Sequence, residues 1–359
     1  MHEQFLLVAL QQAWRGRGLC APNPSVGAVA VQNGKIISQA WHQSAGTPHA
    51  EQLVLAELPP NLKDITLYVT LEPCNHWGRT PPCVEQIVKY GVRRVVYAYA
   101  DPNPIVATNN TPSILQQHGI DVLHVSLPKI EEFYASYHYW TSYKKPYVTA
   151  KIAQTFDGKI SGPGGARVQL SNSECSVFTH QQRQMTDVIL TSARTINLDD
   201  PHMNARTPEG DLAKPVAIID RTGTVNSKAK IFTSIKRCHI FYAENCSIRE
   251  PIANAEYHPV PCINGLLDLE AIISQLGRLG YHDVWVEVGG KLFTAFHKSR
   301  LVQKTHLYLV PSVLGEESLS AYHYDIFKQA HSITWKKMNN NMIASLIWHA
   351  IEEETCLRV

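Results

Sequence analysis

GTPHAE (residues 46–51) and TLEPCNHWGRTPPC (70–83) place the imidazole of His49, the carboxylate of Glu51 and the thiols of Cys74 and Cys83 in two short stretches of the chain. Zinc takes imidazole and thiolate ligands, and a catalytic zinc site keeps three protein ligands with water in the fourth position. The pattern therefore predicts a catalytic zinc bound by His49, Cys74 and Cys83. Glu51, two residues after His49, is predicted to reach that water rather than the metal, taking its proton and returning it to a leaving amine.

The spacing of the two cysteines departs from that of nucleobase deaminases, in which H-x-E is followed by P-C-x-x-C. Eight residues separate Cys74 from Cys83 here, and the inserted loop contains His76, Gly78 and Arg79. Such a donor-rich loop beside a metal suits a polar, phosphorylated substrate. Both cysteines are expected where a loop gives way to a helix, which favours the thiolate form. The alternatives are a structural zinc with His76 as its fourth ligand, or isolated core residues.

Strands that alternate with helices predict a layered α/β fold in both halves of the chain. In the first half, helices are predicted over 3–16, 49–58, 82–91 and 112–118, and strands over 26–32, 35–41, 65–70, 94–100 and 120–125. In the second half, strands are predicted over 148–153, 187–191, 216–220, 239–243, 284–289 and 305–310, and helices over 172–185, 267–279 and 291–299. The polar, proline-containing stretch SYKKPY (142–147) interrupts the alternation. We therefore expect two domains, residues 1–145 and 146–359.

The composition favours an enzyme of small molecules over a nucleic-acid or membrane protein. The 359 residues carry a net charge of +2, whereas a protein that holds a nucleic-acid backbone usually shows a basic stripe. Neither a signal peptide nor a span of ~20 apolar residues is visible. Eight cysteines in a chain of this length do not indicate a disulfide scaffold, so the expected compartment is the cytoplasm. The expected assembly is a homo-oligomer, with a dimer favoured.

Further segments carry a resemblance to a known family. They are PNPSVGAV (22–29), WH (41–42), DPNP (101–104), KIAQTFDGKI (151–160), ILTSARTINLDDP (189–201) and VWVEVGGKL (284–292). Together with the long PC…GRTPPC segment, they resemble the bifunctional riboflavin-biosynthesis deaminase–reductase family over nearly the whole chain. The resemblance implies a cytidine-deaminase-like α/β/α domain followed by a dihydrofolate-reductase-like α/β domain.

The resemblance also implies two reactions. The amino-terminal domain of such enzymes uses zinc to hydrolyse an amino group of a diaminopyrimidinone that carries a ribosylamino phosphate, which releases ammonia. The carboxyl-terminal domain uses NADPH to reduce the ribose of the product to a ribityl chain. The implied partners are zinc, NADPH and a small phosphorylated pyrimidine, without nucleic acid or membrane.

Carried over residue by residue, the resemblance makes His49, Cys74 and Cys83 the zinc ligands and Glu51 the proton shuttle. The residues that it implies for the substrate are Asn23, His42, His76, Arg79, Asp101, Asn103, Lys151, Arg183, Met203, Arg206 and Glu287. Those that it implies for NADPH are Ala153, Thr195, Asp199, Gly289 and Gly290. Asn23 and Asp101 adjoin prolines, so a turn-forming role is their alternative. For His42 the alternative is a surface histidine.

The second half lacks the G-x-G-x-x-G pattern, so a Rossmann dinucleotide site is not predicted. Gly289-Gly290 instead lies between a predicted strand and a predicted helix, where backbone amides can accept a pyrophosphate. Lys151 and Glu287 both lie in apolar strands, where a buried charge needs a partner. We expect Glu287 to supply the partner of Lys151, and a purely structural ion pair is the alternative.

The sequence departs from the family pattern at three places. Residues 167–171, RVQLS, replace a Ser-x-Trp-Ile loop that is followed by Ser or Thr, and residues 107–110, ATNN, replace a glycine-containing stretch. Arg221 follows Asp220 where relatives tend to carry serine. Because a guanidinium can hold two phosphate oxygens, Arg221 is predicted to bind the cofactor and help select NADPH over NADH. A solvated surface arginine is the alternative.

Two other classes of function remain open on sequence grounds. One is a zinc deaminase of nucleic-acid bases whose accessory carboxyl-terminal domain positions RNA, although the near-neutral charge counts against it. The other is a zinc-stabilised binding protein without catalysis, in which Glu51 would have no role. Ammonia release from the pyrimidine phosphate, compared with cytidine and tRNA, separates the three.

Overall fold

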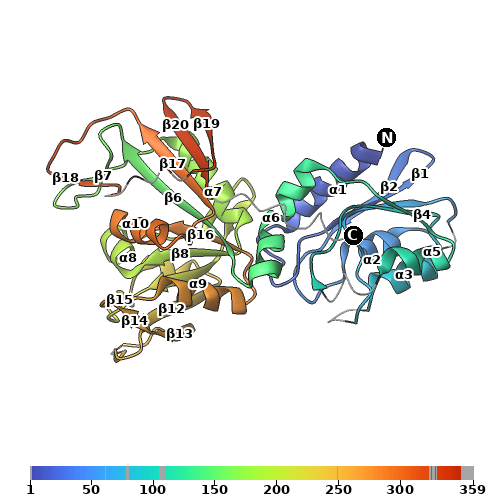
Figure 1. The fold of residues 1–359 in the computed structure, drawn as a ribbon, viewed down its shortest axis with the longest axis horizontal. Coiled ribbons are helices and arrows are strands. Elements are labelled where there is room, and N and C mark those ends of the chain that lie inside the picture. Colours follow the sequence, from blue (N-terminus) through green and yellow to red (C-terminus); the bar gives the residue numbers. More distant parts are fainter. Residues whose placement is uncertain are drawn as a thin grey trace. The chain divides into compact units, whose positions relative to one another are not determined.

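The computed structural model describes residues 2–60, 62–77, 81–104, 110–248, 250–322, 325, 328 and 330–348. The chain divides into two compact units, Met1–Lys144 and Lys145–Val359, so that the division lies one residue from the expected boundary. Figure 1 shows both units with their elements labelled. Within these described ranges no helix combines the length and the apolar character needed to cross a bilayer.

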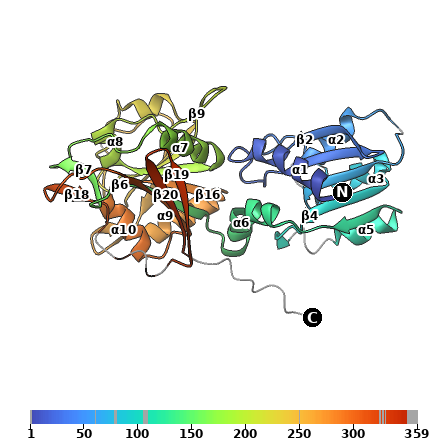
Figure 2. The ribbon, with the colours of Figure 1, turned by 90° about the horizontal axis from the view of Figure 1, so that it is seen from above.

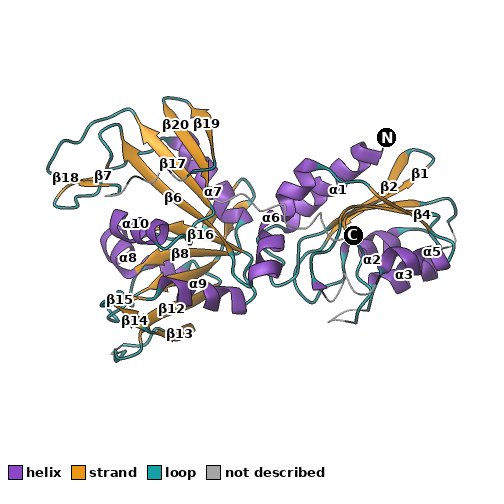
Figure 3. Ribbon diagram, in the orientation of Figure 1, coloured by secondary structure: helices purple, strands orange, loops and turns teal. Residues whose placement is uncertain are grey.

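The first unit is a three-layer α/β/α structure. Its strands are β1 (Gly27–Gln32), β2 (Lys35–Trp41), β3 (Thr66–Leu71), β4 (Arg94–Tyr99) and β5 (Asp121–His124). Its helices are α1 (His2–Gly16), α2 (Ala50–Glu57), α3 (Cys83–Tyr90), α5 (Thr111–Gln117) and α6 (Pro128–Tyr143). The sheet order is β2-β1-β3-β4-β5. Helices α1 and α6 cover one face of this sheet, and α2, α3 and α5 cover the other (Figures 1 and 3).

Local chemistry accounts for this topology. Asn33 and Gly34 both adopt positive φ, at 50° and 74°, which is the geometry of the tight turn that joins β1 to β2 in an antiparallel hairpin. Strands β3, β4 and β5 run parallel, so their crossovers are helices, as parallel strands require. The loop after β3 and the amino ends of α2 and α3 are thereby free to form a site at one edge of the sheet.

The second unit is a larger α/β structure. Its strands are β6 (Tyr147–Thr155), β7 (Lys159–Pro163), β8 (Val188–Ser192), β9 (Ala205–Thr207), β10 (Gly210–Leu212), β11 (Pro215–Ile219), β12 (Arg237–Ala243), β13 (Ala255–Val260), β14 (Cys262–Ile263), β15 (Leu266–Leu267), β16 (Asp283–Glu287), β17 (Lys304–Val310), β18 (Ser318–Ser320), β19 (Ser332–Met338) and β20 (Asn341–Ile347). Its helices are α7 (Ser173–Met185), α8 (Ala193–Asp199), α9 (Leu269–Arg278) and α10 (Gly290–Lys298), with the 3-10 helix η1 (Lys230–Thr233).

Nine of these strands form one sheet in the order β13-β12-β11-β8-β16-β6-β17-β20-β19. The strands from β13 to β17 run parallel, and β17, β20 and β19 pair antiparallel. Figure 2 shows α7 and α8 on one side of the sheet and α9 and α10 on the other. Because parallel strands end at the same edge, the loops that follow β8, β11 and β16 lie next to one another, which is where open α/β sheets bind ligands.

Candidate active sites

The predicted metal ligands converge at one edge of the first unit. His49 is the N-cap of α2, Cys83 is the first residue of α3, and Cys74 lies in the loop after β3. His49 Nδ1 is 3.2 Å from Cys83 Sγ and 3.5 Å from Cys74 Sγ, and the three donor atoms lie within 4.8 Å of one another. Nitrogen and sulfur ligands of a tetrahedral zinc ion are separated by roughly 3.5 Å, so the donor set fits zinc.

Only one of the two cysteines begins a helix. The expectation that Cys74 also lies at a helix start was wrong, because the residues after it form a loop. Its thiolate is stabilised by neighbours instead: hydrogen bonds with Cys83 and His49 lower the pKa of Cys74 to about 4, although burial opposes ionisation. Burial and the adjacent Cys74 raise the pKa of Cys83 well above its usual value. A cation held by both sulfurs removes the cost of ionising the second thiol, which again fits a bound metal.

Glu51 lies in the first turn of α2, beside the metal ligands. Its side chain is buried, and its Oε2 atom has no hydrogen-bond partner among the described residues. Burial raises the pKa of this carboxyl group. Burying a polar atom without a hydrogen-bond partner costs free energy, so the arrangement fits a carboxyl group that binds a water molecule or a substrate atom. The cluster of metal-ligating groups does not include His76, which favours three protein ligands over a four-ligand structural site.

Two of the predicted substrate residues form a pair next to the metal ligands. His42 is buried, so its alternative as a surface histidine is wrong. Its ring lies 5.0 Å from that of His49, edge to face, and its Nδ1 atom is 3.2 Å from the carbonyl oxygen of Pro48. Asn23 Nδ2 is 3.4 Å from His42 Nε2. Burial lowers the pKa of His42, so the neutral ring can accept a hydrogen bond from Asn23 while donating to Pro48.

The remaining substrate residues of the first unit have different surroundings. Asp101 is buried, and its Oδ1 atom accepts hydrogen bonds from the backbone N–H of Asn103 at 2.9 Å and from the hydroxyl of Tyr137 at 3.1 Å. The first of these bonds is the turn-forming role that the adjoining proline had suggested. Burial raises the pKa of Asp101 to about 6. His76 has a buried Nδ1 atom without a hydrogen-bond partner among the described residues, and Arg79 lies outside the residues that the structure describes.

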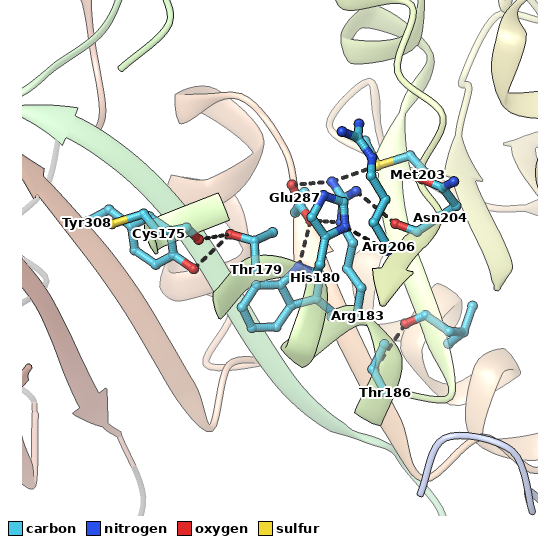
Figure 4. A network of polar contacts seen from close by, with 12 residues as sticks. Cys175, Thr179, His180, Arg183, Thr186, Met203, Asn204, Arg206, Glu287 and Tyr308 are labelled. Carbon is cyan, nitrogen blue, oxygen red and sulfur yellow. Dashed lines mark hydrogen bonds and ion pairs between the residues drawn. The ribbon is translucent and has the colours of Figure 1, made fainter. Parts of the chain in front are cut away.

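In the second unit an arginine links three segments that are distant in sequence (Figure 4). Arg183 on α7 makes a two-pronged ion pair with Glu287 at the end of β16, with Nε–Oε1 at 2.6 Å and Nη2–Oε2 at 3.0 Å. Its Nη1 atom donates to the carbonyl oxygen of Asn204 at 3.1 Å, and its Nη2 atom lies 3.6 Å from Met203 Sδ. Arg183 thus directly contacts two other predicted substrate residues, Met203 and Glu287.

The predicted pairing of Lys151 with Glu287 needs correction. The two residues are register partners on β6 and β16, but the carboxylate makes its ion pair with Arg183. Lys151 Nζ instead lies 5.0 Å from the centroid of the Tyr308 ring, and burial lowers the pKa of this lysine. Burial alone would raise the pKa of Glu287, but the charges of Arg183 and Lys151 hold it at about 2. The site therefore contains one carboxylate between two cations.

The backbone of Arg206, the remaining predicted substrate residue of this unit, lies next to this network. Its backbone N–H donates to Nδ1 of His180 at 3.1 Å, and His180 lies on α7 one turn before Arg183 (Figure 4). Burial lowers the pKa of His180, which keeps Nδ1 available as an acceptor.

Three of the predicted cofactor residues follow adjacent parallel strands. Thr195 is in the first turn of α8 after β8, Arg221 follows β11, and Gly289 follows β16 as the N-cap of α10. The Arg221 side chain is exposed. The backbone around it is held by Asp220, whose carboxylate accepts hydrogen bonds from the N–H groups of Thr224 and Val225 at 2.9 Å each. Thr195, Arg221 and Gly289 therefore face the same edge of the sheet.

The two glycines and the other predicted cofactor residues differ in their surroundings. A Cβ atom at Gly289 would meet nothing within 4 Å, which leaves room for a ligand at the amino end of α10. At Gly290 a Cβ atom would lie 2.5 Å from the carbonyl oxygen of Ala321, so glycine is required there by the protein's own packing. Asp199 is the last residue of α8, at the opposite end from Thr195. Ala153 lies on β6 two residues after Lys151.

Sequence reasoning missed several residues that support these sites. Trp285 Nε1 donates to Glu287 Oε1 at 2.7 Å, and the Tyr308 ring lies beside Lys151. In the first unit, Tyr137 donates a hydrogen bond to the Asp101 carboxylate from α6, a helix that was not predicted. The signal for that helix was present, since apolar residues recur there at three- and four-residue spacing after a proline at the first turn.

Two family models match separate parts of the chain. A family described as the cytidine and deoxycytidylate deaminase zinc-binding region matches residues 1–99, and one described as the RibD C-terminal domain matches residues 146–340. The riboflavin biosynthesis protein RibD of Aquifex aeolicus is 31% identical over 315 residues, which cover 88% of each chain. That of Escherichia coli is 33% identical over 329 residues, which cover 88% of this chain and 89% of the relative.

Solved structures give a consistent result. A deaminase/reductase from Thermotoga maritima, described as diaminohydroxyphosphoribosylaminopyrimidine deaminase and 5-amino-6-(5-phosphoribosylamino)uracil reductase, superposes with a TM-score of 0.85 at 27% identity, covering 97% of this chain and 99% of that one. RibD of Acinetobacter baumannii, form 1, superposes with a TM-score of 0.83 at 27% identity, with the same coverage of both chains.

Proposed function

Because this chain belongs to the RibD family of riboflavin-biosynthesis proteins, we propose which of its residues carry out the two reactions of that family. The chain is a bifunctional enzyme with a zinc-dependent deaminase domain and an NADPH-dependent reductase domain. Its deaminase converts diaminohydroxyphosphoribosylaminopyrimidine with release of ammonia, and its reductase acts on 5-amino-6-(5-phosphoribosylamino)uracil, reducing the ribosyl group to ribityl. Its substrates are small molecules.

The observation that carries the proposed deaminase site is the position of Glu51. Its unpartnered carboxylate oxygen lies buried beside His49, Cys74 and Cys83, which we assign as the zinc ligands. Zinc, when bound, lowers the pKa of a coordinated water toward neutrality. Glu51 accepts a proton from the attacking water and delivers it to the departing amino group, so that the ring carbon exchanges a C–N bond for a C–O bond and ammonia leaves.

Neighbouring side chains orient the pyrimidine in this proposal. Asn23 and His42 stand beside His49 and present an amide and a neutral imidazole, which can read the donor and acceptor groups of a base edge. His76, with a buried nitrogen that lacks a partner, supplies a further contact. Asp101 and Asn103 shape the neighbouring turn, and Arg79 is assigned to the phosphate on the basis of its charge.

For the reductase we assign the substrate to the ionic network and the cofactor to the loops after β8, β11 and β16. Bound NADPH supplies the hydride. The open position above Gly289 and the amino end of α10 fit a pyrophosphate. Lys151, Arg183, Met203, Arg206 and Glu287 hold the ribosyl phosphate chain. We assign Ala153, Thr195 and Asp199 to the cofactor as well, with Asp199 at the periphery.

We also propose a cytoplasmic location and a homo-oligomeric state, with a dimer favoured. The cysteines that the structure describes are all free thiols, which suits a reducing compartment. Strand β19 lies at the edge of the large sheet and exposes Ile333 and Trp335, and an exposed apolar edge strand suits association with another chain.

Residues 1–145, expressed alone, are expected to release ammonia from the pyrimidine substrate without NADPH. The zinc ligands, Glu51 and the surrounding core all lie within the first compact unit. The measurement is ammonia production by zinc-loaded fragment, with the Glu51→Gln fragment as the matched control. A folded, zinc-loaded fragment that releases no ammonia would show that the deaminase depends on the second unit.

Arg221→Ala is expected to lower reductase kcat/KM with NADPH by ~10-fold while leaving the value with NADH unchanged, which corresponds to ~1.4 kcal/mol. The reason is that NADPH differs from NADH by one phosphate, which a guanidinium can hold at two oxygens. Arg278→Ala, an exposed arginine on α9, is the matched control and should change neither value. An equal loss with both cofactors, or no loss, contradicts the assignment.

A further inference from the structure

A second group of metal-ligating side chains lies at the β13 edge of the nine-stranded sheet. His239 is on β12, and Glu256 and His258 are on β13, which runs parallel to β12. Glu256 is the register partner of His239, and His258 is two residues further along, so the three side chains share one face of the sheet. One donor atom from each lies within 4.8 Å of the others.

The spacing of these atoms matches that of ligands around one ion. His239 Nδ1 is 3.1 Å from His258 Nε2 and 3.3 Å from a carboxylate oxygen of Glu256. Ligands bound at about 2.0–2.1 Å around a tetrahedral ion lie about 3.3 Å apart. The deaminase ligands show similar separations, 3.2 Å and 3.5 Å.

Hydrogen bonding alone accounts poorly for this geometry. His239 Nδ1 faces both an imidazole nitrogen and a carboxylate oxygen, yet a ring nitrogen carries one proton or one lone pair and so bonds well with only one of them. A metal ion can satisfy all three groups from a common centre.

The other nitrogen of the buried His239 ring is also held as in a metal site. Nε2 lies 2.9 Å from the hydroxyl of Tyr281. Histidines that bind a metal through one nitrogen almost always donate a hydrogen bond from the other, which fixes the ring and its tautomer. Tyr281 can accept that bond, so Nδ1 is left unprotonated toward Glu256 and His258.

The positive charge of Arg237, which lies beside Glu256, opposes the binding of a cation at this site. Arg237 Nε lies 3.4 Å from Glu256 Oε1, whereas it is the other oxygen, Oε2, that faces His239. The carboxylate can therefore bridge the guanidinium and a metal ion. The side chain of Glu256 is 45% exposed, so an ion can enter from solvent and keep water at its remaining position.

We propose that His239, Glu256 and His258 form a second metal site, which binds a divalent transition-metal ion of the zinc class. Two imidazoles and one carboxylate are ligands that zinc and its neighbours in the series accept. Because β13 is the outermost strand, the bound ion ties this edge to β12. The site contains no thiol, which distinguishes it from the deaminase centre.

Cobalt(II) is the probe, added to full-length protein that already carries zinc at its thiolate site. We expect one further equivalent to bind with weak visible d–d bands and without an intense thiolate-to-cobalt charge-transfer band. His258→Ala and Glu256→Gln should each weaken this binding by ~10-fold or more, and hydrogen exchange of Ala255–Val260 should slow when the ion binds. His331→Ala, an exposed histidine of the same unit, is the matched control and should bind as the parent does.

The outcomes are distinguishable. An intense thiolate-to-cobalt charge-transfer band would show that cobalt has displaced zinc from the deaminase site. If this displacement accounts for all of the bound cobalt, without separate d–d bands, the second site is overturned. Binding of no further equivalent at 1 mM cobalt, on the order of the weakest affinities of protein metal sites, also overturns it. So does a further equivalent that persists unchanged in both His258→Ala and Glu256→Gln.

Discussion

Glu51→Gln is expected to lose ~10²–10⁴-fold in the rate of ammonia release while keeping its zinc. Transfer of a proton by a positioned side chain contributes a factor of that size, and an amide cannot accept the proton of the attacking water. Glutamine is nearly isosteric with glutamate, so the buried position and the first turn of α2 should remain intact. The kcat of ammonia release should therefore fall, and the zinc content should stay unchanged.

The measurement is ammonia release at saturating substrate, with zinc determined by elemental analysis of the same preparations. Cys83→Ala is the matched control: it should lose zinc and activity together, because it removes a ligand at the first residue of α3. Hydrogen exchange of peptides from β3 and β4 reports whether the first unit of each variant is folded, and reductase activity reports that the second unit is intact. Loss of zinc from Glu51→Gln, or retention of zinc in Cys83→Ala, would reverse the roles that we assign to the two residues.

The first unit was largely predictable because its signals are local. An Asn-Gly turn, the apolar runs of β3 and β4, and the ligands His49, Cys74 and Cys83 could each be found within a few residues. Helix α6 was missed even though Ile130, Phe133, Tyr134 and Tyr137 have helical spacing. The position of Cys74 in a loop was also missed, because the cause of its low pKa is contact with Cys83 and His49 rather than helix geometry.

The second unit was less predictable because its site depends on contacts between distant segments. Lys151 and Glu287 were expected to pair from their apolar strands, and they are indeed neighbours in register. The sequence gives no sign that Arg183, from a helix more than a hundred residues before Glu287, makes the ion pair. Strands β19 and β20 were also not predicted. Strand β19 lies at the edge of the sheet and buries one of its residues, Met338, so the alternation of buried and exposed residues that marks a strand is weak there.

Arg183→Met is expected to destabilise the second unit by about 3–5 kcal/mol, the cost of leaving one member of a buried ion pair without its partner. Both side chains are little exposed, 12% for Arg183 and 13% for Glu287. Among the residues that the structure describes, Glu287 then keeps Trp285 as its hydrogen-bond donor and Lys151 as a nearby cation. The segment at Met203 and Asn204 also loses its tie to α7, so reductase activity should fall as well.

The same pair gives the unit a defined sensitivity to acid. The pKa of Glu287 in the folded chain, about 2, is lower than its ordinary value of 4.5. A carboxyl group with a lowered pKa stabilises the fold above the ordinary value, and this contribution is lost as the pH falls from about 4.5 toward 2. The shift corresponds to about 3 kcal/mol. In Arg183→Met the loss over this range should be smaller, because the carboxylate no longer faces the guanidinium.

Hydrogen exchange of peptides from β8 and β16, followed over increasing urea, measures the stability of the second unit without interference from the first. Lys230→Ala is the matched control, since it removes an exposed ion pair with Asp200 in the same unit and should cost about 1 kcal/mol or less. Glu287→Gln should destabilise the unit as Arg183→Met does, and the double variant should cost less than the sum of the two, because the partners are coupled. If Arg183→Met cost no more than Lys230→Ala, or if the two changes were additive, the ion pair would not be the interaction that holds α7 to β16.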